Sequence, residues 1–106
     1  MKLWLDDIRL PPDASWTWAK SAHAAIALLR HPPEPITEMS FDHDLGHTLT
    51  YREYTGYDVA CVLEELARDS ILPRVKWRIH SANPIGRQRI AMALKNADKY
   101  WDIHEH

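Results

Sequence analysis

The amino-acid sequence predicts an α/β fold of three layers, with about four parallel strands and three helices. This prediction rests on two observations. Short nonpolar runs alternate along the chain with longer segments whose nonpolar residues recur at helical spacing. No internal repeat, low-complexity tract or long linker divides the 106 residues, so we expect a single domain over residues 1–106.

The first strand is expected over residues 2–5, where a nonpolar run is followed by two aspartates and then by a pair of prolines. The prolines disfavour a regular helix directly after this strand. Residues 16–19 alternate and are rich in strand-forming side chains, which predicts a second strand and a candidate edge strand. Ser21 is expected to cap an alanine-rich helix that ends near Arg30.

The remaining elements follow the same alternation. Residues 36–41 predict the third strand, and a polar stretch over residues 42–55 follows it. Connections of this length in a small domain often carry function. A nonpolar stripe predicts a helix over residues 57–68, and residues 75–80 predict the fourth strand. Asn83, followed by a proline, indicates the N-cap of the last helix.

Bulk composition excludes several classes of protein. No nonpolar run approaches the roughly 18 residues that a membrane-spanning helix needs. Acidic residues near the N-terminus argue against a signal peptide, and the single cysteine, Cys61, cannot form an internal disulfide, so we expect a cytoplasmic protein. The net charge of −2 argues against an extended nucleic-acid-binding surface but leaves room for one phosphate in a local pocket.

Polar side chains that can carry chemistry follow three of the four predicted strands. In open parallel sheets, ligands bind beyond the carboxyl ends of the strands. We therefore expect one edge of the sheet to bring together the residues that follow the first, third and fourth strands, namely Asp6, Asp7, Asp42, His43, Asp44, His80 and Ser81.

The carboxylates in this set predict a metal site. Several carboxylates in one crevice repel each other unless a cation or raised pKa values allow them to coexist. Carboxylate and carbonyl oxygens suit Mg²⁺, or Mn²⁺ in its place. We expect Asp6, Asp7, Asp42 and Asp44 to hold this ion, with the alternative that Asp44 is only a turn or capping residue.

The two strand-end histidines add groups that titrate near neutral pH. His43 and His80 are candidate acid and base residues, although each can equally be a histidine that is simply hydrogen-bonded to a neighbouring carboxylate. His47 lies four residues after His43, but the intervening Gly46 disfavours the helical turn that a metal-binding pair would need.

Several groups near the same edge can bind an anion. Arg9 can hold a phosphate in bidentate fashion or neutralise the acidic pair that precedes it. The last helix should point free amides toward the segment from Ser81 to Asn83, and both of these side chains are candidate phosphate contacts.

The motifs at these positions resemble response-regulator receiver domains. The Asp6-Asp7 pair resembles the receiver acidic pair, and the segment FDHDLG places Asp42 at the phosphorylated position. The resemblance implies a metal contact from the backbone carbonyl of Asp44, and Ser81 matches the hydroxyl residue that closes the fourth receiver strand. The sequence departs from receivers in the two prolines after the first strand, in extra residues before Gly56, and in the missing fifth strand with its lysine.

The combination LDDIRLPP, FDHDLG, TGYDV and IHSANPIG is similar to the family of cyclic-phosphate processing receiver domains, and it covers nearly the whole chain. This similarity implies a shortened receiver-like, flavodoxin-like fold and a metal-assisted phosphoesterase that opens cyclic phosphates. The expected substrate is an RNA 3′ end carrying a 2′,3′-cyclic phosphate or a small cyclic-phosphate nucleotide. In this reading Asp42, His43, His80 and Ser81 are catalytic, and Arg9 and Asn83 bind substrate.

Two alternatives remain. The chain can be a receiver-like signalling or binding module that recognises a phosphorylated ligand or partner without turnover. It can also be an interaction protein that uses Trp16 and Trp18 as a contact surface.

Overall fold

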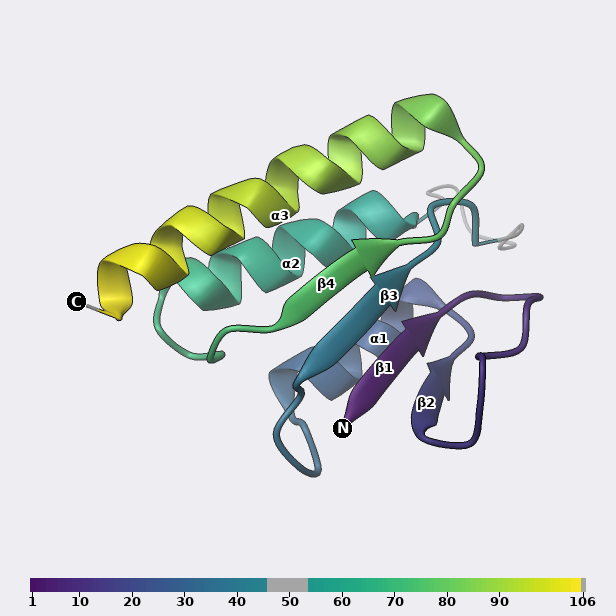
Figure 1. Ribbon diagram of the computed structural model, residues 1–106, viewed down its shortest axis with the longest axis horizontal. Helices are drawn as coiled ribbons and strands as arrows, with labels where there is room; N and C mark the ends of the chain where they lie inside the picture. The colour runs from purple at the N-terminus through teal and green to yellow at the C-terminus, as the bar shows by residue number, and fades with distance from the viewer. Residues whose placement is uncertain (46–53, 106) are drawn as a thin grey trace.

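The computed structural model describes residues 1–45 and 54–105. Four strands and three helices follow one another in the order β1 (Lys2–Leu5), β2 (Trp16–Ala19), α1 (Ala22–Arg30), β3 (Glu38–Phe41), α2 (Gly56–Arg68), β4 (Lys76–Ile79) and α3 (Pro84–His104) (Figure 1). The α/β fold with four parallel strands and three helices is therefore confirmed.

The four strands form one parallel sheet with the order β2-β1-β3-β4. As expected, β2 lies at an edge. Two crossovers, through α1 and through α2, run in the same direction across this sheet. Because such crossovers are right-handed, they place both helices on the same face. The segment that joins β1 to β2 contains no helix, since residues 6–15 include the two prolines.

The described helices cover only one face of the sheet, so the fold has two layers and the predicted third layer is not formed. In Figure 1, α1 lies behind the sheet, α2 packs beside α1, and α3 packs against α2 and β4. The physical reason is local: the proline-containing connection after β1 replaces the helix that would have covered the other face. The core joins the inner sheet face to all three helices through residues such as Leu3, Leu5, Met39, Phe41, Leu29, Val59, Leu63, Ile90, Leu94 and Trp101.

Element boundaries agree with the predictions to within a few residues at most ends. Thr55 is the N-cap of α2 and forms a capping box with Asp58, so this helix begins one residue earlier than predicted. Asn83 caps α3 by accepting a hydrogen bond from the Gly86 N–H, as the sequence indicated. The strands β3 and β4 are shorter than predicted. Ile36 and Val75 are buried in the core, but each lies before the first hydrogen-bonded residue of its strand.

Within the described residues, no helix combines the length and nonpolar composition that crossing a membrane requires.

Candidate functional site

The register of the sheet brings three polar residues side by side. Leu5, Phe41 and Ile79 are neighbours across β1, β3 and β4. The residues that follow them are Asp6, Asp42 and His80. Their backbones continue the ladder for one step, since the Asp42 N–H donates to the Leu5 carbonyl and the His80 N–H to the Phe41 carbonyl, both at 2.9 Å. The carboxyl edge of the sheet therefore carries the predicted cluster.

Asp6, Asp7 and Asp42 form a group of carboxylates that can hold a metal ion. Each offers an oxygen atom, and these atoms all lie within 4.8 Å of one another. Asp6 and Asp42 are buried, and Asp7 is half-buried. An all-oxygen donor set of this kind suits a hard divalent cation that keeps several of its waters. The residues present thus fit the metal that the sequence predicted.

The local backbone holds Asp6 in place for this role. Its Oδ1 accepts hydrogen bonds from the N–H groups of Ile8 and Arg9, both at 2.8 Å. Its backbone carbonyl accepts a hydrogen bond from the Trp18 indole at 2.7 Å. The turn after β1 is therefore built around the Asp6 side chain.

The two buried carboxylates differ in their acidity. Burial alone would raise the pKa of Asp6, but the N–H groups of Arg9 and Ile8, together with His80, bring that pKa below its usual value. The pKa of Asp42 is raised, first by burial and then by the negative charge of Asp6. A cation between the two would relieve this repulsion.

These carboxylates face a cleft of about 320 Å³, which lies near the lower end of the range for small-ligand sites, roughly 300–1,000 Å³. The cleft is lined by Asp6, Asp7, Ile8, Arg9, Asp42, Asp44, Ser81 and Ala82. Its size suits a phosphate with part of the attached sugar.

Two side chains in the cleft can contact a phosphate. The Arg9 guanidinium donates to the His80 carbonyl at 2.9 Å and lies 3.9 Å from Asp6 Oδ2, which leaves most of its donors on the exposed side. The Ser81 hydroxyl oxygen accepts a hydrogen bond from the Asn83 N–H at 3.1 Å, so its own hydrogen can be donated to an anion. Both residues keep the placement predicted from the sequence.

His80 reaches the cluster through Asp6 rather than through the cleft. Its Nε2 lies 3.0 Å from Asp6 Oδ2, and its Nδ1 lies 2.7 Å from the Ser40 hydroxyl. The imidazole stacks on Trp4, with ring centroids 3.9 Å apart and planes within 1°. Burial lowers the pKa of His80, although the Asp6 carboxylate acts in the opposite direction. The lowered pKa favours the neutral imidazole, and the contact with Oδ2 lets His80 orient Asp6.

His43 also contacts the site through an aspartate. Its Nδ1 lies 3.0 Å from Asp44 Oδ1, and Asn83 Nδ2 donates to the same oxygen at 3.4 Å. A Cβ atom at Gly86 would lie 2.3 Å from the His43 ring, so the ring packs against the start of α3. The hydrogen bond from His43 lowers the pKa of Asp44. Like His80, His43 does not line the cleft.

Gly56 allows α2 to begin directly under the end of β3. A Cβ atom at this position would lie 1.9 Å from the Asp42 carbonyl oxygen, a distance that no side chain tolerates. The Gly56 N–H donates to the His43 carbonyl at 2.9 Å. The glycine therefore allows the start of α2 to pack directly against the backbone of Asp42.

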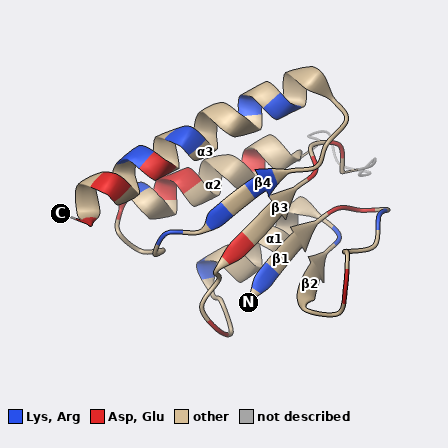
Figure 2. Ribbon diagram, in the orientation of Figure 1, with Lys and Arg blue, Asp and Glu red and all other residues tan. Residues whose placement is uncertain are grey.

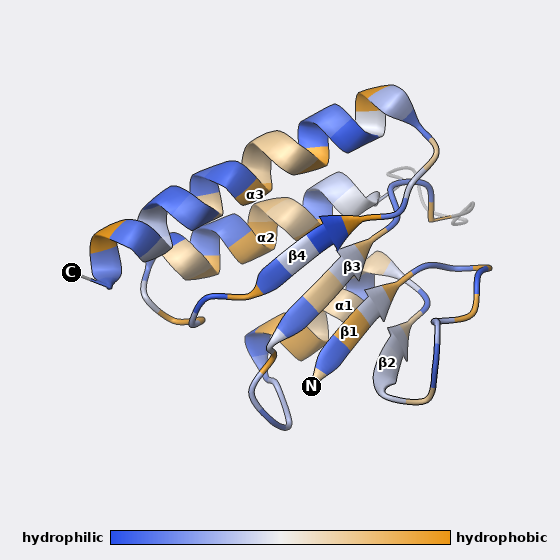
Figure 3. Ribbon diagram, in the orientation of Figure 1, coloured by the Kyte–Doolittle hydropathy of each residue, from blue (hydrophilic) through white to orange (hydrophobic). Residues whose placement is uncertain are grey.

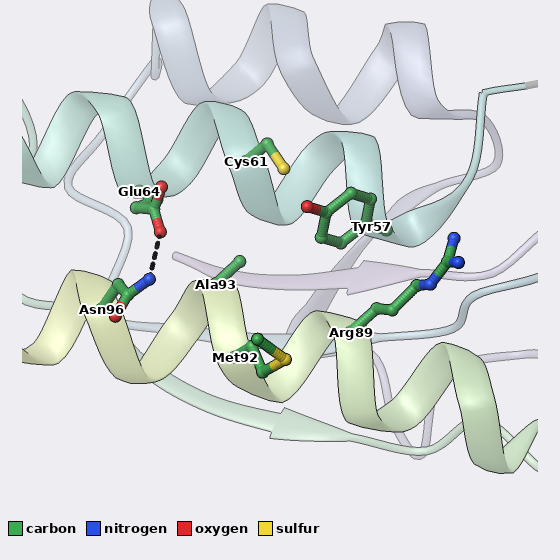
Figure 4. A pocket seen from close by; sticks show the side chains of 7 residues that line it. All are labelled: Tyr57, Cys61, Glu64, Arg89, Met92, Ala93 and Asn96. Carbon is green, nitrogen blue, oxygen red and sulfur yellow. Dashed lines mark hydrogen bonds between the residues drawn. The ribbon is translucent and has the colours of Figure 1, made fainter.

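A second cavity lies between α2 and α3 and contains none of the predicted site residues. Figure 4 shows its lining by Tyr57, Cys61, Glu64, Arg89, Met92, Ala93 and Asn96. Asn96 donates to Glu64 across the two helices at 3.0 Å. Burial raises the pKa of Cys61, which keeps it a protonated thiol rather than a nucleophile.

The structure brings nearly all of the predicted site residues into one region, and it adds three that the sequence did not single out. Ser40 and Trp4 hold His80, and Gly86 contacts His43. Strand alternation could have indicated Ser40 and Trp4, because both lie on the face that also presents His80. His47 and most of the long polar connection lie outside the described residues.

Comparison with known proteins adds one finding. No curated protein and no solved structure matches the chain. The sequence does match the family described as the cyclic-phosphate processing receiver domain, and the match covers residues 1–96. The chain therefore belongs to this family of cyclic-phosphate processing receiver domains.

Proposed function

We propose that this protein is a metal-assisted phosphoesterase that opens cyclic phosphates, with the 2′,3′-cyclic phosphate of an RNA end or of a nucleotide as substrate. One observation carries the proposal. Three carboxylates that can hold a cation face the same small cleft as an arginine and a serine that can bind phosphate oxygens. The family to which the chain belongs supports the same chemistry.

Asp6, Asp7 and Asp42 would hold Mg²⁺ or Mn²⁺ in this proposal, and Asp44, which lines the same cleft outside this group, would add a further oxygen. Such an ion would supply positive charge to the phosphoryl oxygens and lower the pKa of water. Arg9 donates to a phosphate oxygen from the exposed side of the site, which orients the ring that opens.

Ring opening adds one water molecule. The water oxygen forms a bond to phosphorus, one ring P–O bond breaks, and the departing sugar oxygen gains a proton. Ser81 donates a hydrogen bond to the phosphate, and Asn83 fixes the position of that hydroxyl. The product is a phosphate monoester on one of the two neighbouring sugar hydroxyls.

His43 and His80 are the candidate residues for the proton transfers. Each ring is hydrogen-bonded to a residue that lines the cleft, His80 to Asp6 and His43 to Asp44. A ring in this position exchanges a proton with water in the cleft only after its bond to the aspartate opens. His80 also acts as a positioning residue for Asp6, so its loss should weaken metal binding as well as turnover.

The test uses an RNA oligonucleotide that ends in a 2′,3′-cyclic phosphate, incubated with and without Mg²⁺ or Mn²⁺, followed by separation of the products. We expect metal-dependent opening, and a loss on the order of a thousandfold in Asp42→Asn because this carboxylate is part of the metal set. Asp69→Asn is the matched control, since Asp69 is exposed and paired with Arg68 at the end of α2. Absence of opening with any metal would refute the enzyme for this substrate.

A non-catalytic binding module is the second candidate, and a specific observation favours it. Neither histidine ring lines the cleft, and both nitrogens of His80 already have partners. Such a module would bind a phosphate monoester in the presence of Mg²⁺ without changing it. Titration calorimetry with a nucleoside monophosphate, combined with the turnover assay, separates the two functions.

A further inference from the structure

The face of the sheet that the helices leave uncovered has a distinct chemical character. Strand alternation places eight residues of the four strands on it, in two rows that follow the register: Lys2, Trp16, Glu38 and Lys76 in the first row, and Trp4, Trp18, Ser40 and Arg78 in the second. Leu3, Leu5, Met39 and Phe41 point to the opposite face and enter the core.

Cations dominate the charged groups on this uncovered face. Lys2 Nζ lies 4.8 Å from the centroid of the Trp16 ring, and the Arg78 guanidinium lies 5.0 Å from the same ring. Glu38 is the only acidic residue in the two rows. Asp13, in the connection between β1 and β2, also lies near Lys2. β4 carries Lys76 and Arg78 and β1 begins with Lys2, and Figure 2 shows basic residues along β4 and at the start of β1.

These cations keep their charge available. Within residues 1–45 and 54–105, none of Lys2, Lys76 and Arg78 forms an ion pair. By contrast, Arg74, which precedes β4 and lies beside α3, forms ion pairs with Asp98, Asp102 and Glu105. An indole beneath a cation also holds it at the surface without neutralising it.

The cations lead toward the cleft. Arg78 and Lys76 precede His80 by two and four residues on β4, and two residues of a strand span about 6.6 Å. Arg9 stands at the end of the line, where its guanidinium donates to the His80 carbonyl. The strand that carries both basic residues therefore ends at the cleft, and the Arg78 side chain crosses the uncovered face to place its guanidinium over Trp16 of β2.

We propose that this uncovered face binds the single-stranded RNA segment that precedes the terminal cyclic phosphate, with Arg78 and Lys76 contacting its backbone phosphates. The inference rests on the proposed function and selects an RNA end over a free cyclic nucleotide as the substrate. A mononucleotide ends within the cleft and cannot reach β4, whereas a strand continues past His80 onto the cations. The surface is local, which reconciles it with the net charge of −2.

The experiment combines Lys76→Ala with Arg78→Gln and measures two properties. The first is binding of a fluorescent single-stranded RNA with an ordinary 3′-phosphate, followed by anisotropy over a range of salt concentrations. We expect binding to weaken about tenfold, and the salt slope to fall by about 1.4 because two phosphate contacts on a single strand are lost. The second is turnover of the cyclic-phosphate oligonucleotide against 2′,3′-cyclic AMP, where KM should rise for the oligonucleotide alone.

The matched control replaces Lys95 and Lys99, two exposed lysines of α3, by alanine, because this change removes the same charge from the helical side. Thermal unfolding of both variants, and of Arg78→Lys, identifies any loss of folding. Equal RNA affinity in the two double variants would overturn the proposal, as would binding to phosphatidylserine vesicles in place of RNA. Absence of turnover on both cyclic substrates, with RNA binding still dependent on Lys76 and Arg78, would refute the enzyme but not this surface.

Discussion

The two faces of the sheet are built from the same four strands, yet they differ in almost every physical property. One face packs under three helices and joins a continuous nonpolar core. The other carries tryptophans beneath cations, together with Ser40 and His80, and no helix in the described part of the chain covers it. In Figure 3, the edge strand β4 is largely hydrophilic, which fits a strand with one face open to water.

The two faces therefore contribute to different properties of the protein. Burial of nonpolar side chains on the helical face supplies most of the free energy that opposes unfolding. The uncovered face contributes a network of polar and aromatic contacts that ends at Asp6. The candidate site lies where the two faces meet, at the carboxyl ends of β1, β3 and β4. Substitutions on the two faces should therefore have different consequences.

The largest effect is expected on the helical face. Leu63 on α2 is fully buried, so Leu63→Ala should lower the free energy of unfolding by about 2–5 kcal/mol. Lys76→Ala on the uncovered face should cost much less, because Lys76 is exposed and its truncation leaves no cavity. Urea unfolding of both variants measures the difference, and a greater loss in Lys76→Ala would contradict the contrast between the faces.

Removal of His80 should have the next largest effect on stability. His80→Ala leaves one oxygen of buried Asp6 and the Ser40 hydroxyl without this partner, at a cost of about 1–3 kcal/mol. His31→Ala is the control, since His31 is exposed at the end of α1. Urea unfolding should separate the two variants. Equal stability in both would mean that the contacts of His80 do not stabilise the fold.

Asp42→Asn should stabilise the metal-free protein while it abolishes the effect of metal. The pKa of Asp42 is higher in the folded state than in the unfolded chain, so above both values its negative charge opposes folding. Removal of that charge should raise Tm at pH 7 by a few degrees. Added Mg²⁺ should raise Tm of the natural protein only. A lower Tm in the variant without metal would show that the charge of Asp42 is not a source of repulsion.

The smallest effect concerns pH. The pKa of His80 lies below its usual value of 6.5, so the unfolded chain binds a proton before the folded protein does. The stability contributed by neutral His80 is fully present above pH 6.5 and is lost as pH falls toward the folded pKa. Tm of the metal-free protein should therefore fall between pH 6.5 and 5, and His80→Gln should reduce that dependence. An unchanged slope would assign the pH dependence to other groups.

Local patterns were enough to predict the elements and the edge of the sheet at which the candidate site residues lie. The first two strands agree with their predicted bounds, because each nonpolar run ends in residues that interrupt a strand. Because parallel strands all end at the same edge of a sheet, the direction of the strands was enough to predict that Asp6, Asp42 and His80 lie close together. Neither step required knowledge of which side chains pack together.

Layering and side-chain orientation could not be predicted in this way. The sequence suggested helices on both faces, but the face that a helix covers depends on the order of strands and the hand of each crossover. The histidines show the same limit. Both stand at the expected strand ends, yet Trp4 and Ser40 hold one ring on the uncovered face, and Gly86 holds the other against α3.

The sequence by itself determined the α/β class, the family and the set of residues at the carboxyl edge of the sheet. These properties depend on nonpolar periodicity and on motifs that are local in the chain. The tertiary structure decided that the sheet keeps one face open, that three carboxylates share one cleft, and that both histidine rings contact aspartates instead of lining the cleft. Those properties depend on contacts between residues far apart in sequence, such as His80 with Asp6 and Asp44 with Asn83, which only a folded chain brings together.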